Sequence, residues 1–251
     1  MPSRRLRCVL QREGSVGERA IRVSAADKAS EPIDTIVDGV FFTQPGRLPR
    51  GPHRLDRDTV LAAQRERFLI AFTELVAAHG FAKLRVSDVT ARSGTSKTAF
   101  YDCFDSLDQC AKTAYARFVE VLLQRMTEYL AGAHEPRDVT APLLAYLQTL
   151  QQDPVVARAF QLELYNEGRF GREQRRIALR RFAELIRSEH LALVQRDPAH
   201  VAEHPLEVYL GLVYAVRQLA SDALDTERTP DLVGLVPRLR AWIAAGLGIS
   251  Q

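Results

Sequence analysis

The stretch Gly80–Phe104, GFAKLRVSDVTARSGTSKTAFYDCF, predicts two short helices joined by a tight turn. The first spans roughly Val86–Ser93, and the glycine that follows it ends the helix. The second spans roughly Ser96–Phe104. Either Thr95 or Ser96 can cap it, because a short hydroxyl side chain accepts a hydrogen bond from the free N–H groups of a first turn. Helices this short bury little surface alone, so they require a third helix to pack against.

The second of these helices has two different faces. Lys97, Thr98 and Tyr101 lie on one face. The opposite face is apolar and is formed by Ala99, Phe100, Cys103 and Phe104. A short helix whose polar residues point away from a small core is the arrangement that reads the DNA major groove. The alternative is a polar helix face that binds nothing.

A longer amphipathic helix precedes this pair, and another follows it. Apolar residues at three-and-four spacing predict a helix from Arg57 to His79, which Asp56 or Asp58 can cap. A second long helix, about Leu107 to Ala131, begins directly after the short pair. It is long enough to connect the small domain rigidly to the rest of the chain.

The C-terminal half is predicted to be helical throughout, with no strand-like alternation. Prolines and glycines divide it into segments. The candidate helices are residues 139–152, 154–167, 172–196, 204–226 and 230–247. Pro237 falls inside the last segment, where we expect it to kink or divide the helix.

The first 45 residues differ from the helical part of the chain. Charges alternate and no helical period persists, so we expect residues 1–45 to form a flexible extension. The segment 33–44, IDTIVDGVFFTQ, could instead be a short strand or a docking segment. Residues 45–55 combine prolines and glycines with Arg47, Arg50 and Arg54. They form either a linker or a basic arm laid along the duplex.

Charge is distributed unevenly along the 251 residues. The net charge of +3 is small, and 46% hydrophobic content with 26% charged residues is typical of a soluble globular protein. From Arg47 to Arg117 the chain holds 12 Lys and Arg against 8 Asp and Glu. The positive excess therefore lies with the predicted DNA-reading helices, although a solvated face explains the same bias.

Several other classes of protein find no support in the sequence. No apolar run is long enough to span a membrane, and no apolar segment follows the basic N-terminus as in a secretory signal. We therefore expect a cytoplasmic protein. No nucleophile–base arrangement is recognisable, so we expect no enzymatic activity, no cofactor and no metal. His200 and His204 have the spacing of a metal pair but lie between two prolines, where a helical face is doubtful.

Residues 65–115 resemble the DNA-binding domain of the TetR-like transcriptional regulators. The matching features are the Gly-Phe pair after the first helix, the V-x-D-V-x-x-x-x-G-x-S run from Val86 to Ser96, and the F-Y-x-x-F run from Phe100 to Phe104. A capped fourth helix follows at once. The C-terminal half has about the length of the family's ligand-binding domain but carries a weak sequence signal.

This resemblance implies an all-α fold, in which an N-terminal three-helix helix-turn-helix DNA-binding domain (46–106) is joined by a long helix to a C-terminal helical ligand-binding and dimerisation domain (107–251). It implies a homodimer that pairs through the helices at 204–226 and 230–247. It also implies a repressor that a small molecule releases from a near-palindromic DNA operator. The alternative is a helical protein-interaction module without DNA-binding activity.

The resemblance also implies which residues contact DNA. The expected DNA-binding residues are Arg47, Arg50, Arg54, Arg85, Thr95, Ser96, Lys97, Thr98 and Tyr101. Two positions depart from the family pattern. Leu107 stands where many members have a phosphate-binding Lys, and Arg85 stands where many have Thr. Arg85 could supply the cationic contact that Leu107 lacks.

A ligand site is expected among the C-terminal helices, because a few polar groups stand on otherwise apolar segments. The candidate ligand-binding residues are Phe160, Glu163, Tyr165, Phe182, Tyr214 and Arg217. The alternative for the aromatic residues is plain core, and for the charged residues a salt bridge.

Overall fold

The computed structural model describes residues 32–46, 56–132, 141–164, 168–198 and 200–249. The chain divides into two units, Met1–Pro32 and Ile33–Gln251, and all described residues except Pro32 belong to the second. Regular structure among the described residues is helical, apart from one isolated bridge between Asp38 and Phe42. No helix of these described ranges combines the length and apolar character needed to cross a bilayer.

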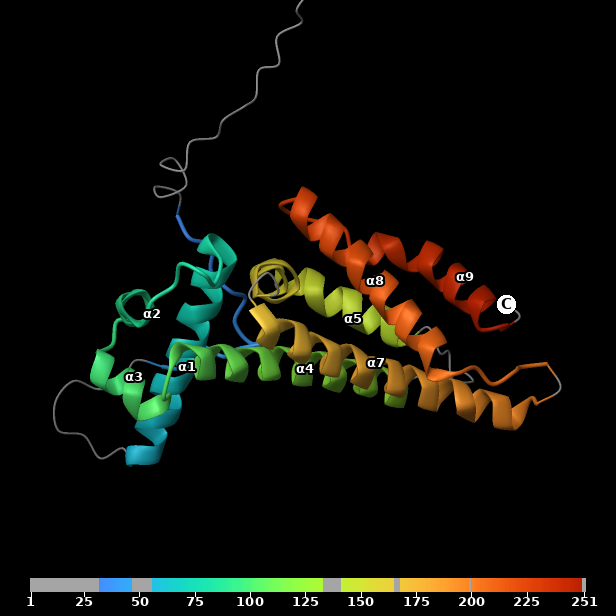
Figure 1. The fold of residues 1–251 in the computed structure, drawn as a ribbon, viewed down its shortest axis with the longest axis horizontal. Coiled ribbons are helices and arrows are strands. Elements are labelled where there is room, and N and C mark those ends of the chain that lie inside the picture. Colours follow the sequence, from blue (N-terminus) through green and yellow to red (C-terminus); the bar gives the residue numbers. More distant parts are fainter. Residues whose placement is uncertain (1–31, 47–55, 133–140, 165–167, 199, 250–251) are drawn as a thin grey trace, which may run out of the picture. The chain divides into compact units, whose positions relative to one another are not determined.

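Figure 1 shows the order of the helices. The first four are α1 (Arg57–His79), α2 (Val86–Ser93), α3 (Lys97–Cys103) and α4 (Leu107–Gly132). The remaining elements are α5 (Ala141–Gln152), α6 (Pro154–Arg158), the π-helical turn η2 (Ala159–Glu163), α7 (Gly168–Arg196), α8 (Leu206–Thr226), the 3-10 turn η4 (Val233–Leu235) and α9 (Val236–Gly246).

The three N-terminal helices pack around aromatic side chains. Phe68 of α1 meets the rings of Phe100 and Phe104 edge-on, with centroids 5.2 and 6.4 Å apart. All three rings are buried. Gly80 ends α1 with φ of 73°, a backbone conformation that glycine adopts at little cost, and its N–H donates to the carbonyl of Val76. This small core holds the two short helices that could not be stable alone.

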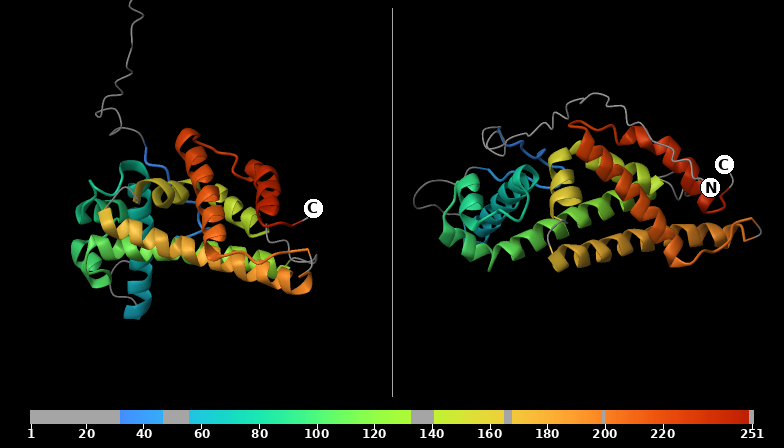
Figure 2. Two further views of the ribbon diagram at one scale, coloured as in Figure 1. Left: turned by 45° about the vertical axis from the view of Figure 1, so that its right-hand side comes forward. Right: turned by 45° about the horizontal axis from the view of Figure 1, so that its top comes forward.

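The long helix α4 leaves this core and runs along the C-terminal helices (Figure 2). Ser106 caps it by accepting a hydrogen bond from the backbone N–H of Gln109 at 3.2 Å. Further along, α4 packs against α5, and Glu120 forms an ion pair with Arg181 of α7 at 2.8 Å. The helix α4 therefore packs against both the N-terminal helices and the C-terminal helices.

Two C-terminal predictions are wrong in detail. The segment 154–167 is not one regular helix, because α6 continues into the π-helical turn η2, and residues 165–167 lie outside the described ranges. The segment 230–247 begins with the turn η4 and becomes helical only at Val236. Pro237 lies in the first turn of α9, where a missing N–H costs nothing, so it starts the helix rather than kinking it.

Residues 33–46, which we call the strap, also differ from expectation. We predicted that they would belong to a flexible extension, with a docking segment as the alternative, and the structure shows the docked form. Phe41 and Phe42 are buried, and the Phe41 ring lies 5.3 Å from that of Phe118 on α4. The physical reason is burial of two large aromatic side chains, which outweighs the cost of ordering a short segment.

Candidate nucleic-acid interface and ligand cavity

The turn between α2 and α3 is fixed by short hydroxyl side chains. Gly94 ends α2 in the left-handed conformation, with φ of 66°. Ser96 is the cap of α3, and its Oγ accepts a hydrogen bond from the backbone N–H of Ala99 at 3.1 Å. Thr95 Oγ1 lies 2.7 Å from Ser93 Oγ. The cap therefore belongs to Ser96, while the hydroxyl of Thr95 ties the turn back to α2.

The outward face of α3 presents the side chains expected to contact DNA. Lys97, Thr98 and Tyr101 are exposed, and Tyr101 retains 57% of its surface. The Tyr101 ring stands edge-on to the buried Phe100 ring, with centroids 5.6 Å apart. The ring is thereby supported from beneath, which leaves the phenol group on the exposed side of the helix. This is a rigid polar face held by an aromatic core.

Arg85 occupies the N-cap of α2 and is exposed. A guanidinium has no acceptor, so it cannot cap the helix as Thr or Ser would. Asp88 compensates in part, because its carboxylate accepts a hydrogen bond from the Arg85 backbone N–H at 2.9 Å. Leu107, at the start of α4, is half-buried against the core and offers no cation. The start of α2 therefore presents a cation, whereas Leu107 at the start of α4 does not.

Three expected DNA-binding residues, Arg47, Arg50 and Arg54, lie outside the described residues. Both flanks of their segment are held in place. Arg67 donates a hydrogen bond from Nη2 to the carbonyl of Gly46 at 2.7 Å on one side. On the other side Asp56 caps α1 by accepting from the backbone N–H of Thr59 at 2.8 Å.

Arg65, which sequence reasoning missed, holds the C-terminal end of α3 from the side that faces the core. It donates from Nη1 to the carbonyl of Cys103 at 2.8 Å and from Nη2 to Thr113 Oγ1 at 3.3 Å. Its guanidinium also lies 4.4 Å from the centre of the Phe104 ring. These contacts join α1, α3 and α4 at the C-terminal end of α3. An arginine on the inward side of a predicted helix was the signal that could have identified it.

The nearby thiols show no sign of special reactivity. Burial raises the pKa of Cys103, and burial raises that of Cys110 to about 12. Both thiols are therefore neutral at physiological pH. A reactive cysteine requires a lowered pKa, so neither has the character of a nucleophile.

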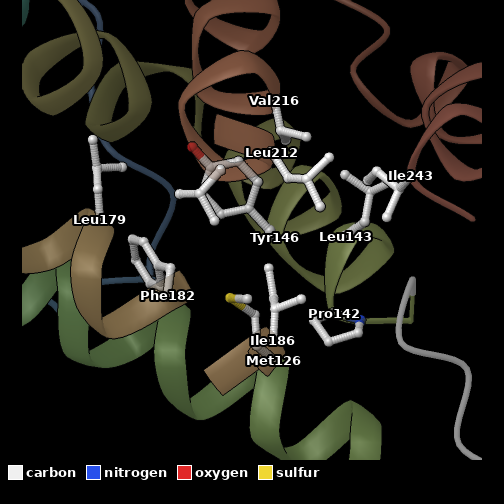
Figure 3. Close-up of a pocket in the computed structure, with 11 residues that line it drawn as sticks. Met126, Pro142, Leu143, Tyr146, Leu179, Phe182, Ile186, Leu212, Val216 and Ile243 are labelled. Atoms are coloured by element: carbon white, nitrogen blue, oxygen red, sulfur yellow. The ribbon is translucent and has the colours of Figure 1, made fainter. Parts of the chain in front are cut away.

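The C-terminal helices enclose an apolar cavity of about 40 Å³ (Figure 3). Side chains from α4, α5, α7, α8 and α9 converge on it. Its lining consists of Met126, Pro142, Leu143, Tyr146, Leu179, Phe182, Ile186, Leu212, Val213, Val216 and Ile243. A volume of this size holds a few water-sized groups, whereas sites for drug-sized ligands measure about 300–1,000 Å³.

The six predicted ligand-binding residues do not converge on one site. Phe182 lines the cavity, and Phe160 packs instead against Phe118 with ring centroids 5.1 Å apart. Tyr214 is exposed on α8, and Tyr165 lies outside the described ranges. Glu163 lies in η2 with its carboxylate against Gly80, where an added Cβ would stand 3.1 Å from Oε2.

Arg217, the sixth, lies in a polar cluster that reaches the cavity through Tyr146. It is buried and donates from Nη2 to the carbonyl of Gln161 at 2.6 Å. Gln161 in turn donates from Nε2 to the Tyr146 hydroxyl at 2.8 Å. Burial raises the pKa of Tyr146 to about 12, so the phenol stays protonated. A polar group in the apolar lining is therefore connected to a buried cation in two steps.

The two histidines with metal-like spacing have separate neighbours. His200 Nδ1 lies 2.7 Å from Asp197 Oδ1, whereas the His204 ring stacks on His190 with centroids 5.6 Å apart. They therefore do not converge on a common point.

Comparison with known structures places the fold. No protein-family model and no curated protein sequence matches this chain. The solved structure of the fatty acid degradation regulator FadR from Bacillus halodurans superposes with a TM-score of 0.64 at 16% identity, over 74% of this chain and 97% of that one. FadR from Bacillus subtilis, solved in complex with stearoyl-CoA, superposes with a TM-score of 0.63 at 15% identity, over 72% of this chain and 97% of that one.

A TetR-family transcriptional regulator from Syntrophomonas wolfei gives a TM-score of 0.60 at 11% identity, over 75% of this chain and 97% of that one. The chain therefore has the all-α fold of TetR-like transcriptional regulators, as its sequence predicted.

Proposed function

We propose that this protein is a sequence-specific DNA-binding transcriptional regulator. The observation that carries the proposal is the polar outer face of α3, formed by Lys97, Thr98 and Tyr101 on a buried aromatic core within a TetR-like fold. Residues 46–106 would bind DNA, and residues 107–251 would bind a ligand and dimerise. The protein would act in the cytoplasm and would not be an enzyme.

Each residue of the α3 face has a distinct role in this proposal. Lys97 reaches a phosphate or a guanine edge, because an ammonium donates to either. Thr98 and the Tyr101 hydroxyl donate to phosphate oxygens and fix the helix in the major groove. Arg85 adds a phosphate contact at the start of α2, in place of the family's contact at the start of α4.

The outward faces of α8 and α9 support a homodimer. Three large apolar side chains are exposed there: Tyr214 at 45%, Leu219 at 44% and Trp242 at 45%. Apolar residues exposed on neighbouring helices are typical of protein–protein contact sites. Two copies paired through these faces would present two recognition helices to a near-palindromic operator.

The cavity supports a ligand-controlled repressor. Its lining is apolar with one phenol, which suits a ligand with an apolar body and a single polar group. Such a ligand has to part the surrounding helices, since the cavity holds only about 40 Å³. FadR of Bacillus subtilis, which has a similar fold, was solved in complex with stearoyl-CoA, and this supports a ligand with a long apolar chain. Separation of α4 from α7 would then move the DNA-binding helices and release the operator.

A DNA-binding assay on the upstream region of the protein's own gene tests the proposal. We expect a salt-sensitive, sequence-selective complex at low micromolar protein concentration. Its footprint should cover two half-sites whose centres lie about one helical turn, or a small multiple of a turn, apart. A complex that any DNA competes away, or no complex at all, would favour a helical protein-interaction module instead.

A further inference from the structure

The strap connects the helix-turn-helix to the C-terminal helices through two successive backbone amides. Ile36 donates its N–H to Glu74 Oε1 on α1 at 3.2 Å. Val37 donates its N–H to Asp153 Oδ2, at the start of α6, at 2.9 Å. Both carboxylates are buried, with 4% and 0% of their surfaces exposed. Neighbouring amides of one segment therefore bind one carboxylate from each half of the protein.

Each carboxylate uses its other oxygen to hold a helix. Glu74 Oε2 accepts hydrogen bonds from Nε and Nη2 of Arg92 on α2, both at 2.8 Å. Asp153 Oδ1 caps α6 by accepting from the backbone N–H of Val156 at 3.1 Å. A continuous chain of contacts thus runs from α2 through α1 and the strap to α6. The helices α1 and α6 also pack directly against each other, so the strap adds a polar link across an existing contact.

Apolar and charged contacts anchor the strap on both sides of this bridge. On the C-terminal side of Ile36 and Val37, the side chains of Phe41 and Phe42 are buried. On their N-terminal side, Asp34 forms an ion pair at 3.1 Å with Arg228, which follows α8. Thr43 donates its N–H to Glu66 Oε1 of α1 at 3.1 Å. If the strap left, both buried carboxylates would each lose a donor, which is costly in a low-dielectric environment. The strap is therefore a built part of the fold.

We propose that the first part of the strap, residues 33–42, acts as an intramolecular clip. The clip fixes the orientation of the helix-turn-helix relative to the C-terminal helices. Docking of the clip restricts the angles that α3 can take in each protomer. Releasing it lets α3 sample further orientations and changes the fraction of molecules whose two recognition helices match the operator. This last consequence rests on the proposed function; the clip itself does not.

Two variants open the clip in different ways. Asp153→Asn keeps one side-chain oxygen that can cap α6, since Asn caps a helix as well as Asp. Its NH₂ group takes the place of the second oxygen and cannot accept the hydrogen bond from the Val37 N–H. Phe42→Ala removes a buried aromatic anchor and keeps every charged side chain, although it also removes the ring that lies 5.9 Å from the Arg117 guanidinium. Asp231→Asn is the matched control, because Asp231 also accepts a backbone N–H, but from Gly234 at 2.9 Å rather than from the strap.

Two measurements on the full chain read the clip directly. The first is amide hydrogen exchange, where we expect residues 33–42 to exchange at least tenfold faster in both variants and unchanged in the control. The second is the distance distribution between spin labels placed through non-canonical amino acids at exposed positions 83 and 180, one in each half. We expect this distribution to broaden in both variants only.

The third measurement is the dissociation constant for operator DNA, which should change at least threefold and in the same direction for both variants. Fast exchange of the strap in the wild-type protein would overturn the clip, and so would an unchanged label distribution after the strap has been released. Label distributions that broaden with unchanged DNA affinity would overturn the consequence for DNA binding. A wild-type protein that binds no DNA would refute the proposed function, while the exchange and distance measurements would still decide the clip.

Discussion

Arg85 combines a structural disadvantage with an expected functional role. It sits at the N-cap of α2 without an acceptor for the helix, and its side chain is exposed. Replacing it with Thr supplies a capping hydroxyl, so Arg85→Thr should raise the free energy of unfolding by roughly 1 kcal/mol. The same change removes a cation and should weaken DNA binding several-fold. Urea unfolding and a DNA titration measure the two effects.

Lys83→Thr is the control for Arg85→Thr, because it removes an exposed charge of the same domain without reaching a cap. It should leave the unfolding free energy unchanged. Equal stability of Arg85→Thr and wild type would show that Asp88 already satisfies the start of α2.

Lys97→Ala and Tyr101→Phe should weaken DNA binding without altering stability or oligomeric state. Both side chains are exposed, and changes at such positions shift the unfolding free energy by no more than about 0.5 kcal/mol. For Lys97→Ala, the slope of log affinity against log salt should fall by about 1, because one phosphate contact is lost. Fluorescence anisotropy at several salt concentrations measures both quantities, with Arg172→Ala on α7 as the control. Unchanged DNA affinity in both variants would place the interface elsewhere.

His190 should make the protein less stable in mild acid. It is fully buried, its Nδ1 lies 2.6 Å from the Tyr209 hydroxyl, and its ring stacks on His204. Burial, and then the neighbouring His204, lower the pKa of His190 below the ordinary 6.5. The unfolded chain therefore binds this proton first, so stability is fully present above pH 6.5 and is lost as the pH falls below it.

Unfolding free energies between pH 8 and pH 5 test the role of His190 against His190→Gln, which keeps an acceptor for Tyr209 but does not titrate. The variant should lose part of the acid-side decline. Asp153 acts in the opposite direction, because burial raises its pKa from 3.8 to about 6, and stability rises as the pH falls through that interval. A decline that persists unchanged in His190→Gln would assign it to other groups.

At the scale of elements, local signals were strongest where periodicity and caps coincide. The ranges Arg57–His79 and Val86–Ser93 were predicted as they occur, because three-and-four spacing and a terminal glycine mark both. The π-helical turn η2 leaves no such local signal, since its extra residue is set by tertiary packing. Apart from Phe182, the lining of the cavity was missed for a related reason: its leucines and valines follow the same pattern as ordinary core residues.

Docking of the strap could not be predicted from the local pattern, because its partners are far away in sequence. Glu74 and Asp153 lie 38 and 116 residues from the amides that they bind. Phe41 and Phe42 were the available signal, since two adjacent aromatic residues rarely stay exposed. The exposed polar face of α3 was predictable because Lys97, Thr98 and Tyr101 alternate with apolar residues on a short helix.

Leu75 tests the core formed by the N-terminal helices. It lies on α1 and is 6% exposed, next to the fully buried Phe72 and Val76. Leu75→Ala should lower the free energy of unfolding by roughly 2–5 kcal/mol, because it removes buried methyl groups and leaves a cavity. Chemical unfolding followed by circular dichroism measures the change, and Ala82→Gly at an exposed turn position provides a mild comparison. A neutral result would mean that the site collapses without penalty or that the side chain is not buried.

At the scale of the whole molecule, α8 and α9 expose large apolar side chains that do not pack in the core of their own chain. On α8, Gly211, Tyr214 and Gln218 form one exposed stripe at the spacing of successive turns. Trp242 stands exposed on α9. A glycine in the middle of a helix costs about 1 kcal/mol relative to alanine, and close approach of a partner helix would offset that cost.

Trp242→Glu should therefore convert the protein to a monomer. A carboxylate placed in the proposed interface would have to be desolvated without a partner in both copies, which disfavours association strongly. Light scattering coupled to gel filtration measures the oligomeric state, and a matched control is Ile177→Glu at a similarly exposed apolar position, 49% exposed on α7. The control should keep the dimer. Because a monomer presents one recognition helix, Trp242→Glu should also lose the two-half-site footprint while α3 itself stays folded. A dimer that survives this substitution with its footprint intact would place the interface on another face.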